Sequence, residues 1–267
     1  MAVVVAGGYA IMAMVGAGCA NRLLFPSPPS SYADSSDLIR LSTSNGDTIV
    51  AVHLTSPGAR RTVIYSHGNG EDLGLARFMY ERIHQAGFNV FAYEYPGYGL
   101  SDGRATEAST CAAIDAAYDY LTRDQGLTPD SIVLYGRSVG SGPSVDLAAR
   151  KPVAGLVLEG AFVSAFRIVT RVPLLWWDKF ENLKKIPHVN CPILIMHGRR
   201  DMIVGFWHGN KLAQAVTDQV QTFWVDEAGH NDLVIVAGER YIDALEKFSA
   251  LIDQARHTPA DITVTSP

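Results

Sequence analysis

A serine between two glycines is the first feature of this sequence that could carry out chemistry. The segment Gly136-Arg137-Ser138-Val139-Gly140 follows an apolar run and precedes a helix-like stretch. This pattern predicts a nucleophile elbow, a turn so sharp that the serine has a strained backbone and the flanking positions need glycine. The elbow holds its serine at a helix N-terminus, where negative charge is favoured. We therefore predict that Ser138 is a nucleophile.

A serine hydroxyl becomes a good nucleophile only beside a base, and the base needs a carboxylate to orient it. In hydrolases with such an elbow, the acid and then the histidine follow the serine along the chain. Asp201 follows the apolar run 193–196, and His230 follows the run that ends at Val225. Because the carboxyl ends of parallel strands meet at one edge of a sheet, we expect both residues beside Ser138. The sequence thus predicts a Ser-His-Asp triad.

The tetrahedral intermediate of acyl transfer needs hydrogen-bond donors for its oxyanion. One donor is expected from the backbone N–H of Val139, directly after the nucleophile. The second is expected from Asn69, in the loop His67-Gly68-Asn69-Gly70 that follows another apolar run. We predict that Asn69 and Val139 form the oxyanion hole.

The same glycine-rich loop fits a second interpretation. Residues 68–74 follow a strand and lead toward a helix, and Glu94 follows the next strand, as in a dinucleotide-binding fingerprint. That interpretation makes the protein a nicotinamide-dependent oxidoreductase. The glycine spacing is broken, however, and Glu71 and Asp72 would face a pyrophosphate. A hydrolase is therefore favoured, and a catalytically idle hydrolase fold used as a binding module is the other alternative.

Alternating strands and helices must position these residues. Strands are predicted over 48–54, 61–66, 89–93, 131–135, 154–158, 192–196 and 221–225. Helices are predicted over 71–86, 107–123, 139–150 and 238–254. Several strands are apolar throughout, which is typical of a sheet covered by helices on both faces. The sequence predicts an α/β-hydrolase fold with a mostly parallel central sheet over residues 37–256.

An apolar insertion is the candidate for the substrate pocket. We predict that residues 162–187 form a short cap above the strand ends and line an acyl pocket. The pocket residues we single out are Phe162, Leu175, Trp176 and Trp177. A helix packed into the core is the alternative interpretation of this segment.

The first twenty residues differ in kind from the rest. Residues 2–20 carry no charge and contain Val15-Gly16-Ala17-Gly18-Cys19, which resembles a bacterial lipobox with Cys19 as the lipidated residue. An uncleaved membrane anchor and an ordinary cleaved signal are the alternatives. All three place the catalytic domain at a membrane or beyond it, in the cell envelope or secreted. We predict a Pro- and Ser-rich linker over 21–36 and a loose tail over 257–267.

Charge and cysteine content argue against several other classes of protein. The 267 residues have a formal net charge of −5 and no basic run, so no nucleic-acid partner is expected. The three cysteines, which include Cys111 and Cys191, form no Cys-x-x-Cys pair, so no zinc site is predicted. Buried, inert thiols are expected at these two positions, and a disulfide between them stays open.

The chain from about Arg61 to Leu251 resembles the α/β-hydrolase-domain-containing protein 17 depalmitoylases and their bacterial relatives. The matching stretches are Ser66–Asn69, Asp72–Gly74, Tyr95–Gly99, Ser144–Arg150 and Ala228–Asp232.

The resemblance places the family's nucleophile, acid and base on Ser138, Asp201 and His230. It implies hydrolysis of acyl esters or thioesters without a metal or organic cofactor. The animal members have a Cys-rich, palmitoylated N-terminus, whereas this chain has the single Cys19 after its signal-like segment. We therefore expect a carboxylesterase at the cell envelope that acts on a small-molecule or lipid acyl substrate.

Overall fold

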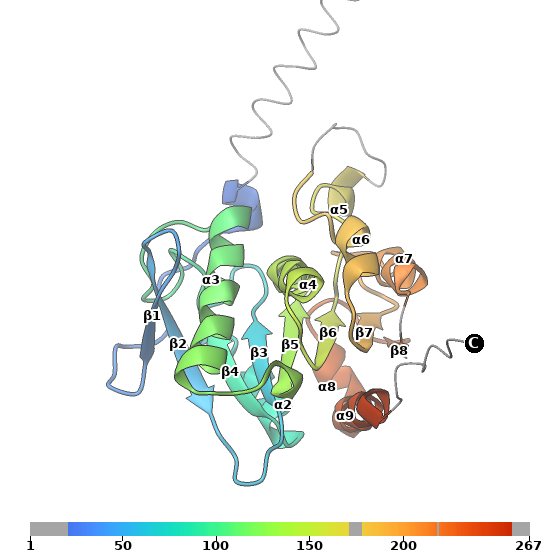
Figure 1. Cartoon of the computed structure of the whole chain (residues 1–267). Helices are drawn as coiled ribbons and strands as arrows, with labels where there is room; N and C mark the ends of the chain where they lie inside the picture. The colour runs from blue at the N-terminus through green and yellow to red at the C-terminus, as the bar shows by residue number, and fades with distance from the viewer. Residues whose placement is uncertain (1–20, 171–177, 218, 258–267) are drawn as a thin grey trace, which may run out of the picture.

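An eight-stranded sheet forms the centre of the computed structural model, which describes residues 21–170, 178–217 and 219–257. The strands are β1 (Ile39–Ser42), β2 (Thr48–Leu54), β3 (Thr62–Ser66), β4 (Asn89–Tyr93), β5 (Ile132–Arg137), β6 (Gly155–Glu159), β7 (Ile193–Gly198) and β8 (Val220–Val225). Their order across the sheet is β1-β2-β4-β3-β5-β6-β7-β8 (Figure 1). β2 pairs antiparallel with β1 and β4, and every other pairing is parallel. The predicted mostly parallel sheet is confirmed.

Helices cover both faces of the sheet (Figure 1). They are α2 (Arg77–Gln85), α3 (Glu107–Asp119), α4 (Ser141–Arg150), α5 (Arg167–Thr170), α6 (Asn182–Lys185), α7 (Trp207–Ala215), α8 (Leu233–Ala237) and α9 (Glu239–His257). One buried cluster packs the sheet against α3, α4 and α7, and a second packs it against α2, α8 and α9. Two cores therefore enclose the strands, as the continuous apolar runs predict.

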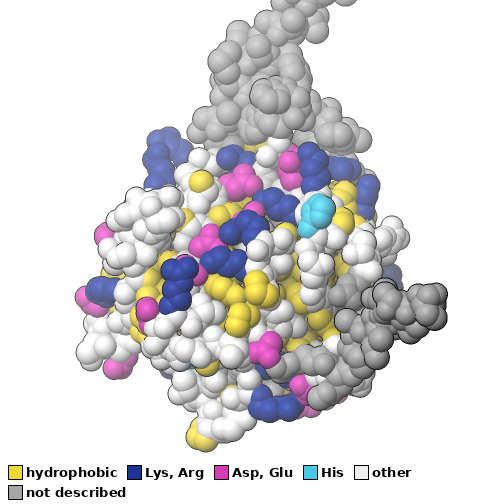
Figure 2. Space-filling view, in the orientation of Figure 1, with side chains coloured by type: hydrophobic (Ala, Val, Ile, Leu, Met, Phe, Trp, Pro, Cys, Tyr) yellow, Lys and Arg dark blue, Asp and Glu magenta, His cyan; other side chains and the backbone are white. Residues whose placement is uncertain are grey.

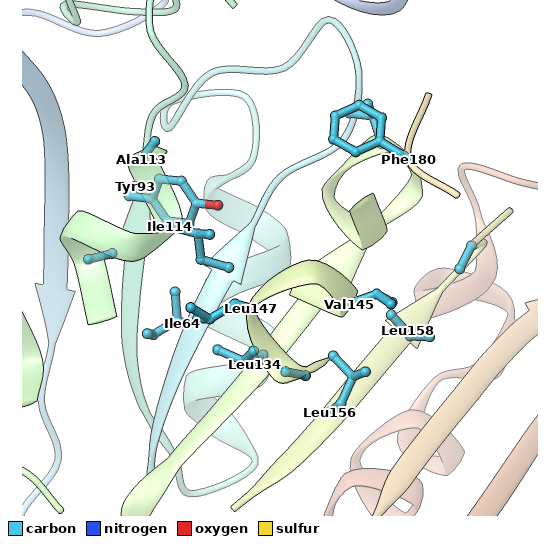
Figure 3. Close-up of a cluster of buried hydrophobic side chains, with 14 of the residues drawn as sticks. Ile64, Tyr93, Ala113, Ile114, Leu134, Val145, Leu147, Leu156, Leu158 and Phe180 are labelled. Atoms are coloured by element: carbon cyan, nitrogen blue, oxygen red, sulfur yellow. The ribbon is translucent and has the colours of Figure 1, made fainter. Parts of the chain in front are cut away.

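The strands are buried because their apolar side chains meet helices on both sides. Every residue of β3, β5, β6 and β7 is buried. Under α4, the strand residues Ile64, Leu134 and Leu156 pack with the helix residues Val145 and Leu147 (Figure 3). Burying one such side chain stabilises the fold by roughly 1.5–3 kcal/mol. This packing fixes the strand ends that carry the candidate catalytic residues.

Charges of both signs are mixed on the surface of α3 and α4. Arg150 forms ion pairs with Asp115 and Asp146, and Lys151 pairs with Asp119. Figure 2 shows Lys, Arg, Asp and Glu side chains interspersed on this face of the molecule. Such a surface is typical of a solvated protein face.

The helix predicted from Glu71 onward begins later, at the start of α2, so that part of the prediction was wrong. The carboxylate of Asp72 accepts a hydrogen bond from the N–H of Leu75 at 2.9 Å. The carboxylate of Glu94 accepts one from the N–H of Leu73 at 2.8 Å. These acidic side chains hydrogen-bond to the backbone N–H groups of residues 73 and 75. The backbone at 73–76 therefore forms a turn, and the helix begins only at Arg77.

Other elements were missed or displaced by the sequence predictions. The predictions omit β1, α7 and α8. The predicted C-terminal helix is present as α9, and Gly238 separates it from α8. Gly238 has a φ of +58°, a left-handed conformation that glycine adopts without a Cβ clash.

Residues 21–36, which the sequence predicts as a linker, lie against the domain. Phe25 is buried, and its ring centroid lies 6.0 Å from that of Phe180. The hydroxyl of Tyr32 donates a hydrogen bond to the buried carboxylate of Glu94 at 2.8 Å. Aromatic packing and hydrogen bonds thus hold this segment beside the carboxyl edge of the sheet.

Cys111 lies on α3, and Cys191 lies just before β7. Cys111 is a partly buried free thiol, so the disulfide between the two that the sequence left open is not formed. Burial raises the pKa of the Cys111 thiol well above its ordinary value, which keeps the thiol protonated and unreactive. The structure supports an inert role for Cys111.

The predictions for the chain ends concern residues outside those that the structure describes. These are the segment 1–20 with Cys19, and the tail after His257. Among the residues that are described, none of the helices is long and apolar enough to cross a membrane.

Candidate active site

The elbow turns at Ser138, between β5 and α4. Ser138 has a φ of +50°, which is strained for a residue with a Cβ, as the sequence predicts. A Cβ on Gly136 would lie 2.6 Å from the carbonyl oxygen of Gly140. A Cβ on Gly140 would lie 2.2 Å from the carbonyl oxygen of Ser66. Both positions therefore need glycine, and the elbow can pack against the end of β3.

Ser138, His230 and Asp201 form a continuous chain of hydrogen bonds at the carboxyl ends of β5, β8 and β7. The hydroxyl of Ser138 donates to Nε2 of His230 at 2.9 Å. Nδ1 of His230 donates to Oδ2 of Asp201 at 2.6 Å. The side chains of His230 and Asp201 are 7% and 1% exposed. The structure thus brings together the three residues that the sequence proposes as a triad.

The carboxylate of Asp201 is surrounded by hydrogen-bond donors. Its Oδ1 accepts from the N–H groups of Ile203 and Val204 at 2.9 and 2.8 Å. Nε2 of His197 lies 3.3 Å from Oδ2, on which His230 also donates. Burial by itself would raise the pKa of Asp201, but the hydrogen bonds from His197 and His230 hold it well below its usual range. Asp201 therefore stays ionised and can keep His230 in one tautomer.

An apolar cavity of about 570 Å³ opens over Ser138. We call the catalytic side of this cavity the polar floor. Its lining residues are Ser138, Val139, Asn69, Arg137, His230 and Asn231, and Asp201 supports it from behind His230. We call the lining residues from two other segments the apolar wall. They are Leu23 and Leu24, and Phe162, Ala165, Phe166, Ile168, Val169 and Thr170. The size and apolar lining are typical of a site for a small molecule.

Both predicted oxyanion donors, Asn69 and Val139, border the same cavity as Ser138. Val139 directly follows the nucleophile, in the short 3₁₀ turn that precedes α4. The loop before Asn69 is held in place because the N–H of Gly68 donates to the carboxylate of Glu71 at 3.0 Å. The two residues come from separate segments of the chain that meet at this cavity.

The insertion contributes to both the cavity and the core. Phe162, a predicted pocket residue, lines the cavity together with other residues up to Thr170. Phe180 and Ile186 are fully buried in the core beside α4 and α6. The other predicted pocket residues lie outside the described part of the chain: Leu175, Trp176 and Trp177.

Sequence reasoning missed the polar groups that surround the triad. Nη1 of Arg137 donates to Glu71 at 2.5 Å, and Nη2 donates to Asn231 at 3.0 Å. Arg137 lies inside the elbow and Asn231 directly follows His230, so both could have been singled out by adjacency to a motif. His197 could not, because its contact with Asp201 depends on how the turn after β7 folds.

The chain has relatives among known proteins. Residues 57–185 match the family model described as serine aminopeptidase, S33. The chain is 37% identical over 210 residues to the α/β-hydrolase domain-containing protein aho-3 of Caenorhabditis elegans, spanning 78% of this chain and 63% of that protein. It is 35% identical over 219 residues to the human α/β-hydrolase domain-containing protein 17B, spanning 80% of this chain and 75% of that protein. The chain belongs to the α/β-hydrolase domain-containing protein 17 family.

The fold of this hydrolase is shared with solved structures of low sequence identity. A Pyrococcus furiosus esterase superposes on this chain with a TM-score of 0.71 at 18% sequence identity. The superposition covers 84% of this chain and 98% of the esterase chain. The predicted α/β-hydrolase fold is therefore confirmed. The family and the fold together make the protein a hydrolase.

The dinucleotide-binding interpretation of the glycine-rich loop was wrong. Glu94, which would have bound a ribose, is buried and accepts hydrogen bonds from Tyr32 and from the backbone of Leu73. Glu71 is paired with Arg137. The loop therefore binds other parts of this hydrolase and has no helix N-terminus directly after it.

Proposed function

We propose that this hydrolase cleaves carboxylic ester or thioester bonds of acyl substrates through an acyl-enzyme intermediate. The observation that carries the proposal is the hydrogen-bond chain Ser138–His230–Asp201 at the base of an apolar cavity. A serine aligned with a base, and a base aligned with a buried carboxylate, is the arrangement that nucleophilic acyl transfer requires.

In the first half-reaction, Oγ of Ser138 attacks the carbonyl carbon of the acyl group and its proton passes to Nε2 of His230. The negative charge that forms on the carbonyl oxygen is stabilised by the N–H groups of Asn69 and Val139. One such donor typically accelerates the reaction by about 10²–10³. The bond to the leaving alcohol or thiol then breaks, and His230 returns the proton to the leaving group.

In the second half-reaction, His230 takes a proton from water, which attacks the carbonyl carbon of the acyl-enzyme. The ester bond to Ser138 breaks, the serine regains its proton from His230, and the carboxylic acid leaves. Asp201 stabilises the imidazolium in both halves without taking up a proton. Because His230 carries every proton, the scheme uses no metal or organic cofactor.

The apolar wall supports an acyl chain as the group next to the scissile bond. Its members include the apolar side chains of Phe162, Phe166 and Ile168, which line the cavity. Each buried CH₂ group of a ligand contributes about 0.8 kcal/mol of binding free energy. A small-molecule or lipid acyl ester or thioester therefore fits the cavity better than a charged substrate.

We also propose that the N-terminus attaches the hydrolase to a membrane of the cell envelope. Residues 2–20 are uncharged and include the lipobox-like cysteine, Cys19. Leu23 and Val169 in the apolar wall are 75% and 86% exposed, and Ile203, which also lines the cavity, is 55% exposed. Exposed apolar side chains next to an apolar cavity support a site that faces lipid.

The catalytic proposal is tested by hydrolysis of short p-nitrophenyl esters by the wild type and Ser138→Ala. Loss of a catalytic serine typically lowers kcat by about 10⁴ or more, and that loss is expected here. Ser249→Ala, a change on the distant helix α9, is the matched control and should keep wild-type activity. Full activity in folded Ser138→Ala would overturn the assignment.

The membrane proposal has its own test. Mass spectrometry of the mature protein is expected to find a lipidated Cys19 as the new N-terminal residue, and Cys19→Ala is expected to leave the membrane fraction. An unmodified, soluble mature chain would contradict this proposal without affecting the catalytic one.

A further inference from the structure

A buried ion cluster lies beside the triad and has no role in the steps above. Its centre is Arg137, the residue directly before Ser138, whose side chain is 7% exposed. The guanidinium donates to Glu71 at 2.5 Å, to Asn231 at 3.0 Å and to Glu159 at 3.4 Å. These partners come from the loop after β3, the loop after β8 and the end of β6. One side chain of the elbow thus contacts three neighbouring segments of the carboxyl edge.

Glu71 connects the guanidinium to the loop of the proposed oxyanion hole. One oxygen of its carboxylate accepts from Arg137, and the other accepts from the N–H of Gly68 at 3.0 Å. Gly68 directly precedes Asn69. The packing is also close, because a Cβ on Gly68 would lie 2.6 Å from Nη1 of Arg137. The position of the Asn69 amide therefore depends on where the guanidinium lies.

Asn231 connects the guanidinium to the loop of the proposed base. Its Oδ1 accepts from Nη2 of Arg137, and it directly follows His230. On the other side of the histidine, the N–H of Gly229 donates to Asp232 at 2.6 Å. The loop is thus fixed on both sides of His230.

The chemistry of the cluster requires an arginine. Burial would lower the pKa of Arg137, but the carboxylates of Glu159 and Glu71 raise it above its ordinary value, so the side chain stays charged. Glu159 is itself held by the hydroxyl of Tyr135. A guanidinium presents several donors in a rigid plane, whereas the ammonium of lysine is a single point charge. Only the planar group can reach all three partners at once.

We propose that Arg137 is a positioning residue that fixes the Asn69 amide and the His230 ring relative to Ser138. It acts through Gly68 and Asn231. The inference rests on the proposed serine-hydrolase function and extends it. Because alignment errors of about 1 Å can cost 10²-fold in rate, loss of the cluster should lower kcat more than it changes KM.

The test is steady-state hydrolysis of p-nitrophenyl acetate by Arg137→Gln and Arg137→Lys. We expect kcat to fall about 10- to 100-fold in both, with KM within about twofold of the wild type. The double variant Arg137→Gln/Glu71→Gln should fall no further than Arg137→Gln alone, because the two residues act as one unit. A wild-type kcat in folded Arg137→Gln, an effect confined to KM, or full additivity would overturn the inference.

The matched control is Arg61→Gln. Arg61 is also a buried arginine, 4% exposed, and it pairs with Asp253 at the amino edge of the sheet. Both arginine variants lose a buried ion pair and should lose thermal stability, but only Arg137→Gln should lose kcat. An equal loss of kcat in Arg61→Gln would show a purely structural effect and contradict the proposal.

A second set of variants covers the case in which Arg137→Gln does not fold. Asn231→Ala and Glu71→Gln keep the arginine, and each is expected to lower kcat by about tenfold. Wild-type kcat in both would overturn the inference. The two proposals fail in different ways. An active Ser138→Ala would contradict the proposed function. Cluster variants with normal kcat, beside an inactive Ser138→Ala, would contradict only the role of Arg137.

Discussion

The polar floor and the apolar wall of the same cavity are built in opposite ways. In the floor, hydrogen bonds of 2.9 and 2.6 Å align Ser138, His230 and Asp201. Among the described residues of the wall, no hydrogen-bond chain fixes the apolar side chains, which range from the buried Phe162 to Leu23 and Val169, 75% and 86% exposed. Hydrogen bonds hold the catalytic side chains in one productive geometry, whereas apolar contacts have no preferred direction and allow a ligand to bind in several positions. The difference teaches that the reaction and the choice of acyl chain are separable in this hydrolase.

The largest expected effect comes from the floor. Asp201→Asn should lower kcat by about 10⁴, because the amide cannot hold His230 in the productive tautomer. The preference for acyl chain length should be unchanged, since the wall is untouched. Ester hydrolysis across an acyl series measures both quantities. Asp226→Asn, a change at a carboxylate that pairs on the surface with Arg199, is the control and should retain full kcat. A changed chain-length preference in Asp201→Asn would contradict the view that the floor sets the reaction rate and the wall sets the choice of acyl chain.

The next effect tests how tightly the elbow that carries the floor is packed. Gly140→Ala would place a Cβ 2.2 Å from the carbonyl oxygen of Ser66, so it should destabilise the fold by about 1–3 kcal/mol. Val169→Leu adds a methylene to an exposed residue of the wall and should leave stability unchanged. Denaturant unfolding of the two variants measures the contrast. Equal stability of both would contradict a floor that is more tightly packed than the wall.

The arrangement of strands could be predicted because it depends on local patterns. The predicted strand 89–93 has the same bounds as β4. It could be predicted because a continuous apolar run is typical of a strand that is buried on both faces. The proximity of Ser138, Asp201 and His230 could be predicted for the same reason, because each follows a strand and the three stand in the order typical of the fold.

The parts that could not be predicted depend on contacts between distant residues. Glu71 was predicted in a helix, but its carboxylate forms an ion pair with Arg137, which is distant in the sequence. Asp72 was placed there too, but it binds Ser31 of the predicted linker segment. Nothing in local sequence pairs these residues, so neither the start of α2 nor the ion cluster follows from a pattern.

A smaller effect is expected from the wall. Phe166→Ala removes an apolar contact from the cavity, so kcat/KM for long-chain esters should fall about 3- to 10-fold, as expected for the loss of one or two buried CH₂ contacts. Hydrolysis of the acetyl ester should change less than about twofold. Phe78→Ala on α2, where the ring is 51% exposed, is the control and should alter neither rate. An equal loss for short and long esters would show that the wall also acts on the reaction.

The smallest effect concerns His208, which joins the wall to the domain. Nδ1 of His208 accepts a hydrogen bond from the N–H of Val163 at 3.2 Å. Burial lowers the pKa of His208 from 6.5 to about 4. As pH falls from 6.5 toward 4, the unfolded chain takes up a proton that folded His208 does not, so stability decreases over that range.

His208→Gln removes this proton uptake. The free energy of unfolding should therefore depend less steeply on pH between 6.5 and about 4 in His208→Gln than in the wild type. Denaturant unfolding at a series of pH values measures the two slopes. Identical slopes would contradict the assignment of a buried, neutral His208.

The central claim is that the floor activates one serine, and covalent labelling tests it most directly. The full-length protein is treated with a fluorophosphonate probe and digested, and the labelled peptide is identified by mass spectrometry. We predict a single adduct on Ser138, formed much more slowly in Asp201→Asn and absent in Ser138→Ala. Labelling of a different serine, or no labelling of the folded wild type, would contradict the claim and favour a catalytically idle hydrolase fold.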